Sequence, residues 1–273
     1  MMEQAKCQQQ SLQKRKESLE MIVRDNDLAL IDTSAIILGR RSILPYLYKK
    51  SNKPIKVSKE FVANAIEYAE FLNELTRTFK VAITHAIKNE IREGIMRLRK
   101  WVDDVSKRKY RKAREQFMLI RRLANLDEKF LENAITIYPP KKLKEYVTNV
   151  ACKIIDTKQE KYGYGYADCE LIAATLCAWK YVKFKCIKAD VNSNKQEKYK
   201  IALISNDKFF QILLKNIYDD KSKNLQSLQD LQNQQGKDQE IIQEIKLYRL
   251  HNEGGDCIYK EAYRLSLPFS FDF

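Results

Sequence analysis

The chain has 273 residues, of which 44% are hydrophobic, so it can bury a substantial core in one large domain or in one domain with insertions. Its 50 Lys and Arg residues outnumber its 36 Asp and Glu residues, and the net charge of +14 favours a polyanionic partner such as RNA or DNA. We expect neither a targeting segment nor a membrane span, since every apolar run falls well short of the roughly 20 residues that cross a bilayer.

The scarce residue types exclude several classes of site. Six cysteines are scattered without a CxxC pair, which favours reduced thiols and a cytoplasmic protein. His85 and His251 are the only histidines, so the chain offers few side chains for a zinc site or a His-based catalytic triad. The seven glycines form neither GxGxxG nor GxxxxGK[ST], which argues against dinucleotide binding and P-loop chemistry.

Apolar runs and helical periodicity predict alternating strands and helices along the chain. After a polar, helical or frayed start, the first half of the sequence predicts a strand at 28–32, helices at 35–50 and 57–78, a strand at 81–84, and helices at 88–101 and 103–133. The second half predicts a short strand at 134–140 stopped by two prolines, helices at 141–158 and 167–182, a strand at 201–205, a helix at 208–218 and a strand at 245–250. This order predicts a three-layer α/β/α fold, in which helices cover both faces of a central, mostly parallel sheet.

Composition divides the chain into three regions. Residues 1–27 form a polar N-terminal extension, and residues 28–218 form the α/β domain with a basic helical insertion near 99–133. Residues 219–273 combine a Gln- and Asn-rich segment, read as a flexible insertion or an exposed helix, with a C-terminal strand and tail.

Two aspartates directly follow apolar strands. In LALIDTSAII, Asp32 stands where the apolar run ends, and in IALISNDKFF, Asp207 follows the strand expected at 201–205. Either residue can cap a following helix by accepting hydrogen bonds from its free N–H groups. Either can also be a catalytic carboxylate, because open α/β sheets place their ligands beyond the carboxyl ends of parallel strands.

Two further acids lie on helices. Glu90 borders an isoleucine stripe, whereas Glu93 points nearly opposite, toward solvent. The stripe consists of Ile83, Ile87, Ile91 and Ile95. In the helix expected at 167–182, Asp168 falls within the apolar face and Glu170 outside it. A buried carboxylate needs a partner, and for Asp168 the helix N-terminus is the alternative to a functional role.

All four acids can converge at one edge of a parallel sheet. Four carboxylates without a counter-charge would repel one another, and a divalent cation removes that conflict. Mg²⁺ and Mn²⁺ prefer oxygen ligands, and either ion suits the hydrolysis of phosphodiester bonds.

The order IDTSAII, NEI, ADCELIAATL and ISNDKFF resembles the PIN-domain nucleases over residues 28 to 218. The resemblance implies a PIN-like fold and metal-dependent hydrolysis that leaves 5′-phosphate and 3′-hydroxyl products. It gives the catalytic, metal-binding positions to Asp32, Glu90, Asp168 and Asp207, with Thr33 and Ser205 orienting acids or waters. The chain is about twice as long as compact PIN toxins, and its cysteines do not match the zinc ribbon of some relatives.

Two segments offer nucleic-acid contacts. The basic run at 97–122 follows the helix that carries Glu90, and its Lys and Arg side chains can track phosphates or form a solvated helix face. The run contains Lys107, Arg108, Lys109, Arg111 and Lys112. In KYGYGYAD, three tyrosines before Asp168 can stack on unpaired bases or pack in the protein. They are Tyr162, Tyr164 and Tyr166.

Together these features predict a Mg²⁺- or Mn²⁺-dependent nuclease that acts on RNA, single-stranded or structured, in preference to DNA. Two alternatives stay open: a non-catalytic nucleic-acid-binding scaffold, and a toxin-type nuclease held by a protein antitoxin. A homodimer or a protein inhibitor is also compatible with the sequence.

Overall fold

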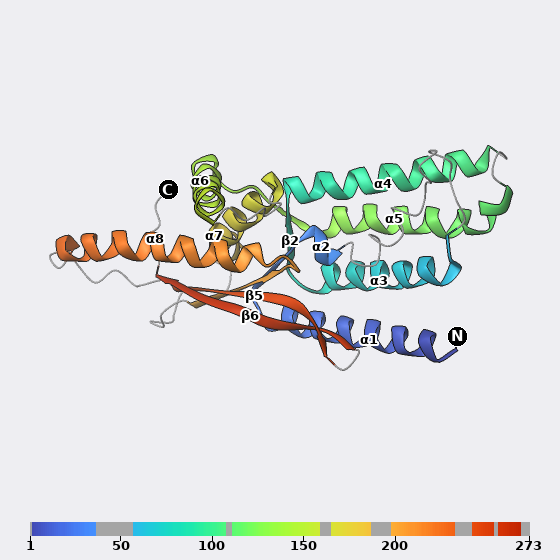
Figure 1. Ribbon diagram of the computed structural model, residues 1–273, viewed down its shortest axis with the longest axis horizontal. Coiled ribbons are helices and arrows are strands. Elements are labelled where there is room, and N and C mark those ends of the chain that lie inside the picture. The colour runs from blue at the N-terminus through green and yellow to red at the C-terminus, as the bar shows by residue number, and fades with distance from the viewer. Residues whose placement is uncertain are drawn as a thin grey trace.

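A six-stranded, mostly parallel sheet organises the chain (Figure 1). The computed structural model describes residues 2–36, 57–107, 111–158, 165–186, 198–232, 242–253 and 256–268. The strands are β1 (Leu28–Ile31), β2 (Val81–Thr84), β3 (Ile135–Ile137), β4 (Lys198–Ile204), β5 (Ile242–Glu253) and β6 (Asp256–Pro268). They lie in the order β3-β2-β1-β4-β5-β6, and every neighbouring pair is parallel except β5 and β6, which are antiparallel.

Helices pack against both faces of this sheet. They are α1 (Met2–Arg24), α2 (Thr33–Ile36), α3 (Lys59–Thr78), α4 (His85–Ser106), α5 (Phe117–Asn133), α6 (Lys141–Lys158), α7 (Tyr166–Cys186) and α8 (Phe209–Gln232), with a 3₁₀ helix, η2, at Arg111–Gln116. Figure 1 shows β5 and β6 between α8 on one side and α1 on the other. The expected α/β class with a mostly parallel sheet is therefore confirmed. Within the described ranges, no helix is both long and apolar enough to cross a membrane.

The central strands are apolar throughout because helices cover them. Every residue of β1 and of β2 is buried, as is usual for parallel strands packed on both faces. β1 pairs with β4 in the register Leu28↔Ile201 to Ile31↔Ile204. This register brings the carboxyl ends of both strands to the same edge, so the residues that follow them, Asp32 and Ser205, begin side by side.

The ends of the chain complete the sheet. Sequence analysis missed β6, although Leu265 and Leu267 are buried on either side of exposed Ser266, an alternation typical of a strand. The first 27 residues are largely one helix, α1, which packs on β6. Ser11 Oγ and Ser18 Oγ of this helix accept hydrogen bonds from β6 backbone N–H groups at 3.3 and 3.1 Å. In the polar segment from residue 219, α8 extends to Gln232, and 233–241 lie outside the described residues.

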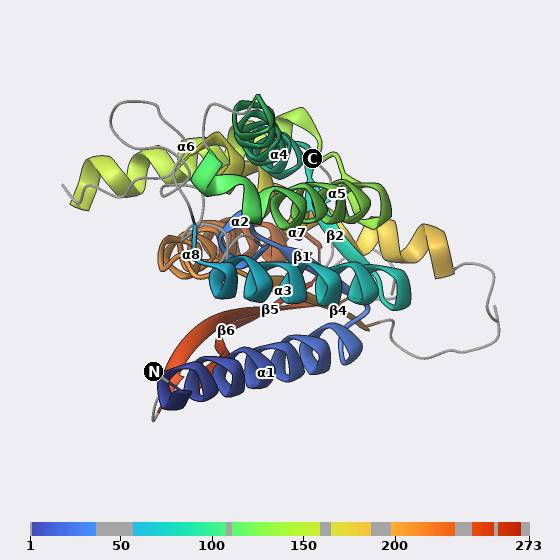
Figure 2. The ribbon, with the colours of Figure 1, turned by 90° about the vertical axis from the view of Figure 1, so that its right-hand side faces the viewer.

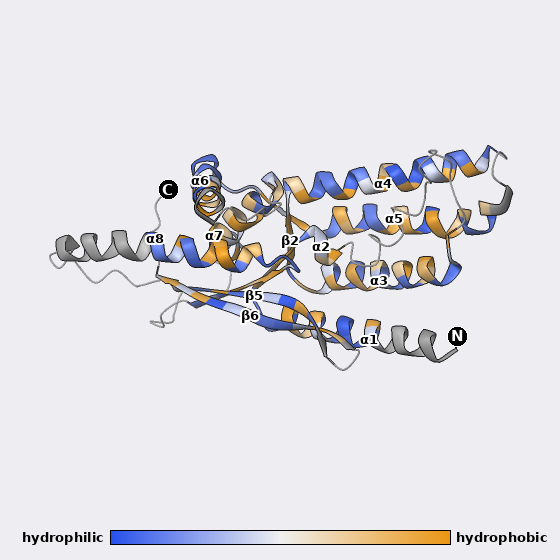
Figure 3. Ribbon diagram, in the orientation of Figure 1, coloured by the Kyte–Doolittle hydropathy of each residue, from blue (hydrophilic) through white to orange (hydrophobic). Residues whose placement is uncertain are grey.

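α3, α4 and α5 form a helical bundle beside the sheet, stacked one above another in Figure 2. The segment expected as one or two basic helices at 103–133 becomes the end of α4, then η2 and α5. Hydrophilic and hydrophobic residues alternate along these helices (Figure 3), and most of the apolar ones are buried, although Phe61, Met96 and Met118 are exposed. The isoleucine stripe of α4 begins at Ile87, since Ile83 belongs to β2. The helix expected at 35–50 is described only up to Ile36.

Candidate functional site

Asp32 lies at the carboxyl end of β1 and is 93% buried (7% exposed). Its Oδ2 atom accepts hydrogen bonds from Ser205 Oγ at 2.9 Å, from Ser34 N at 3.3 Å and from Ser34 Oγ. The contact with Ser34 N is the helix-capping bond that the sequence allowed, because α2 begins at the next residue. The contact with Ser205 crosses from β1 to β4 and ties Asp32 to the second strand end.

Ser205 connects two of the acids. Its buried hydroxyl donates to Asp32 Oδ2 and accepts from the backbone N–H of Asp207 at 3.1 Å. Asp207 in turn accepts from Phe209 N at 2.8 Å through Oδ1, so it also caps the start of α8. One serine thus fixes the side chain of the first acid and the backbone of the other.

Glu90 reaches the same region from α4. Thr33 Oγ1, one residue after Asp32, donates a hydrogen bond to Glu90 Oε2. Glu93, about one turn further along α4 and nearly opposite the isoleucine stripe, has a solvent-exposed side chain near Arg97. The two glutamates of α4 therefore differ in surroundings, and only Glu90 contacts the strand-end residues.

Asp168 completes the group, which we call the acid cluster: Asp32, Glu90, Asp168 and Asp207. Burial raises the pKa of Asp168 from an ordinary 3.8 to about 6. A hydrogen bond from Gly165 N at 2.7 Å opposes that rise, while the negative charges of Asp32, Asp207 and Glu90 add to it. All three other members of the cluster thus lie close enough to repel Asp168.

Each member of the acid cluster keeps one carboxylate oxygen without a hydrogen bond from the described residues. The oxygens in use are Asp32 Oδ2, Glu90 Oε2, Asp168 Oδ2 and Asp207 Oδ1. No described Lys, Arg or His forms an ion pair with any of the four, although the chain as a whole carries a net charge of +14. Capping and a ligand role are therefore compatible, because each capping bond occupies only one of two oxygens.

The chemistry of the acid cluster fits a hard divalent cation, but its present spacing does not form a closed ligand set. In the part of the chain that the structure describes, no group of three or more His, Cys, Asp or Glu side chains is arranged to hold a metal ion. Direct coordination by several of these acids would require their side chains to move inward. Coordination through water would not, and Mg²⁺ usually retains several waters.

Glu170 is the residue that sequence analysis misjudged. The helical wheel placed it outside the apolar face of α7, yet it is only 3% exposed. Its Oε1 atom accepts from the backbone N–H groups of His85 and Ala86 at 3.1 and 3.4 Å, at the start of α4, and its Oε2 atom lies 3.9 Å from Lys144 Nζ. The helical wheel gave the wrong position for Glu170 because it assumes a solvent-exposed face. Every residue from Cys169 to Ala178 is buried, so this part of α7 has no such face.

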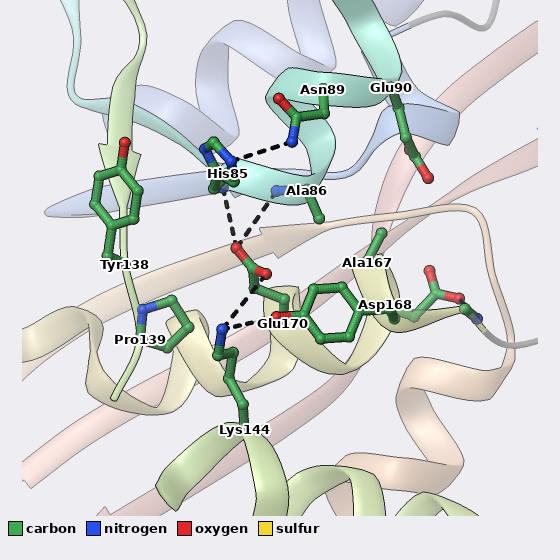
Figure 4. Close-up of a pocket in the computed structure, with 12 residues that line it drawn as sticks. His85, Ala86, Asn89, Glu90, Tyr138, Pro139, Lys144, Ala167, Asp168 and Glu170 are labelled. Carbon is green, nitrogen blue, oxygen red and sulfur yellow. Dashed lines mark hydrogen bonds and ion pairs between the residues drawn. The ribbon is translucent and has the colours of Figure 1, made fainter. Parts of the chain in front are cut away.

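A pocket of about 430 Å³ adjoins the acid cluster. Figure 4 shows His85, Tyr138 and Pro139 on one side of it, with Glu90 and Asp168 on the other. Glu170 and Lys144 lie between these two sides. Of the residues lining this pocket, the sequence had predicted only Glu90, Asp168 and Tyr166 as site residues, since the others come from separate segments without a recognisable motif.

The nucleic-acid contacts expected from the sequence are only partly described. Lys107 is exposed at the end of α4, 17 residues and therefore roughly 25 Å along the helix from Glu90. Arg111 and Lys112 lie in η2, and only the backbone of these two residues is described. Arg108, Lys109, Tyr162 and Tyr164 fall outside the described residues. Tyr166 is 65% exposed beside the pocket, and its hydroxyl accepts a hydrogen bond from Lys144 Nζ at 2.8 Å.

Comparison with known proteins finds no relative of this chain. No family model matches it, and no curated protein or solved structure is significantly similar to it.

Proposed function

We propose that the chain is a nuclease that hydrolyses phosphodiester bonds of RNA with the help of Mg²⁺ or Mn²⁺. The observation that carries the proposal is the acid cluster, in which burial, together with the negative charges of the other three acids, raises the pKa of Asp168 while no described cation pairs with any member. Repulsion between carboxylates lowers the stability of the fold, and a bound cation would offset it. The cluster is therefore better explained as a cation site than as a structural feature. The four motifs that resemble PIN-domain nucleases support the same assignment.

In this proposal the chain's own residues hold and orient the reacting groups. Asp32, Glu90, Asp168 and Asp207 would hold one or two ions, directly or through water. When bound, a divalent ion lowers the pKa of water and stabilises negative charge on phosphate oxygens. Ser205 keeps Asp32 in place and Thr33 does the same for Glu90, since each hydroxyl donates to a carboxylate oxygen and leaves the other oxygen for a ligand.

The rival of a different class is a scaffold that binds RNA without cleaving it. The excess of positive charge supports both, whereas the unpaired acid cluster favours catalysis, because a binding surface for phosphates gains nothing from gathered carboxylates. A toxin held by a protein antitoxin would be the same enzyme under different control.

Matched variants of α4 test the catalytic assignment. The purified full chain should cleave single-stranded RNA with Mn²⁺ or Mg²⁺ and stop in EDTA. Glu90→Gln should lower the cleavage rate by at least about 10-fold, since weakened metal ligation typically costs 10- to 100-fold. Glu93→Gln, the same change on the same helix, should leave the rate unchanged. Cleavage that persists in chelator contradicts the metal; binding without cleavage in either ion favours the scaffold.

The basic run tests where the RNA lies. Neutral replacement of its five predicted contacts should weaken RNA affinity and reduce the dependence of log K on log salt concentration by about 0.7 for each lost phosphate contact. The residues to replace are Lys107, Arg108, Lys109, Arg111 and Lys112. Because Lys107 is distant from Glu90, a parallel replacement of Lys88 and Arg92 separates a contact at the end of α4 from one near its start. An unchanged slope in the first variant would place the RNA elsewhere.

A further inference from the structure

The pocket beside the acid cluster brings together segments from four parts of the chain. The start of α4 supplies His85 and Asn89, the residues after β3 supply Tyr138 and Pro139, and α6 supplies Lys144. The segment that begins α7 supplies the remaining wall. At about 430 Å³ the pocket falls within the usual range for small-molecule and nucleotide sites.

Tyr138 presents an exposed ring on a fixed backbone. The side chain is 62% exposed, so its ring is accessible to a ligand. Its backbone is held from both directions by Tyr181, whose hydroxyl accepts from Tyr138 N at 3.1 Å and donates to Tyr138 O at 3.3 Å. The ring of His85 lies with its centroid 5.8 Å away at an interplanar angle of 31°. These two rings form a wall on which a flat ligand can stack.

Lys144 supplies positive charge between the aromatic wall and the acid cluster. Its Nζ atom donates to Tyr166 Oη at 2.8 Å and lies 3.9 Å from Glu170 Oε2. The hydrogen bond with Tyr166 raises the pKa of Lys144, so the ammonium stays charged at neutral pH. The side chain remains 26% exposed, and an ammonium has three donors, so it can also contact a ligand anion.

We propose that this pocket binds one unpaired nucleobase of the RNA, stacked on Tyr138, while Lys144 contacts an adjoining phosphate. Glu90 and Asp168 line the opposite side of the pocket (Figure 4), so the bound nucleotide lies next to the bond to be cleaved. A base in a duplex is already stacked and paired and cannot enter, which makes the site selective for single-stranded segments. The position relative to the cleaved bond rests on the proposed function; the nucleobase site itself does not.

A binding assay without metal tests the site independently of cleavage. The affinity of a labelled uridine oligomer and of an abasic ribose-phosphate oligomer of equal length is measured by fluorescence anisotropy in EDTA. The proteins are the wild type, Tyr138→Ala, Tyr138→Phe and the control Tyr218→Ala, which removes another exposed tyrosine, on α8. Melting temperatures verify that each variant is folded.

The site predicts that the wild type binds the uridine oligomer more tightly than the abasic one. Tyr138→Ala should weaken binding of the uridine oligomer by roughly 5- to 150-fold, the range for loss of one base–aromatic stack, and leave the abasic oligomer unaffected. Tyr138→Phe and Tyr218→Ala should bind like the wild type. Equal binding of both oligomers by the wild type, or no binding of either, overturns the proposal, and so does an equal loss on both in Tyr138→Ala.

The position of the pocket is tested on cleaved RNA. A single abasic ribose moved along the substrate should slow cleavage by the wild type most strongly at a nucleotide adjacent to the cut. In Tyr138→Ala that positional difference should disappear. If cleavage is most sensitive to an abasic ribose away from the cut, the placement of the pocket is contradicted. If the chain binds bases in EDTA but cleaves no RNA, the nucleobase site is supported and the proposed nuclease function is contradicted.

Discussion

Asp168 and Glu170 lie two residues apart near the start of α7, but they differ in their electrostatic surroundings. The surroundings of Glu170 stabilise a negative charge, and those of Asp168 destabilise it. Glu170 is almost fully buried, yet it accepts two backbone hydrogen bonds at the start of α4 and lies near the ammonium of Lys144. Asp168 accepts one backbone hydrogen bond and is repelled by three other acids. One carboxylate is thus compensated by the protein, and its neighbour is not.

This difference separates a structural acid from a candidate functional one. A helix N-terminus and a cation stabilise a buried carboxylate, so Glu170 joins α7 to α4 and holds Glu90 and Asp168 in fixed relation. An uncompensated acid lowers stability unless a ligand supplies the missing charge. Removing the two charges should therefore have opposite consequences for folding and for activity.

Asp168→Asn should have the largest effect on activity. The amide can still accept the hydrogen bond from Gly165 N, but it removes the charge that a metal needs, so cleavage should fall by at least about 100-fold. RNA binding should persist or tighten, because one charge that repels phosphate is gone. Without metal, the free energy of unfolding should hold or rise. A destabilised protein with full activity would instead assign Asp168 to capping alone, a role worth about 0.3–1 kcal/mol.

Glu170→Ala should have the largest effect on stability. The change leaves two backbone N–H groups without their acceptor and removes the negative charge beside Lys144, and we expect the free energy of unfolding in urea to fall by about 2–3 kcal/mol. Glu170→Gln should cost less, about 1 kcal/mol, because its carbonyl oxygen can still accept from His85 N. A neutral Glu170→Ala variant would show that the contact between α7 and α4 contributes little.

A smaller effect should appear in the pH dependence of stability without metal. The folded pKa of Asp168, about 6, exceeds its ordinary value of 3.8, so between these values the folded chain binds more of this proton than the unfolded chain. Raising the pH through that window therefore destabilises the wild type but not Asp168→Asn. The variant should gain about 1 kcal/mol over the wild type between pH 4 and pH 7, after allowance for solvent screening. Urea unfolding in EDTA at both pH values measures the difference, and equal pH profiles would contradict a pKa of Asp168 raised by burial and by the neighbouring acids.

Asp168 and Glu170 also show where helical periodicity fails to predict which residues are buried. A wheel assigns faces by assuming that one side of a helix meets water, and on α4 this holds: Ile87, Ile91 and Ile95 are buried and Glu93 is exposed. On α7 it does not hold, because β1, β2 and β4 lie against one side while α6 and α8 cover others. Glu170 was therefore placed outside the apolar face, although it is buried against backbone N–H groups of α4.

The sequence by itself determined the α/β class, the positions of β1 and β2, and the placing of Asp32 and Asp207 after strand ends. These features depend on short apolar runs and on the residues that end them, which are local in the chain. Tertiary structure alone decided that β6 closes the sheet against α1, that four acids from distant segments interact, and that Lys144, Tyr138 and His85 share one pocket. Most of those contacts join residues tens to hundreds of positions apart, and they depend on strand order and helix packing, which no local pattern records.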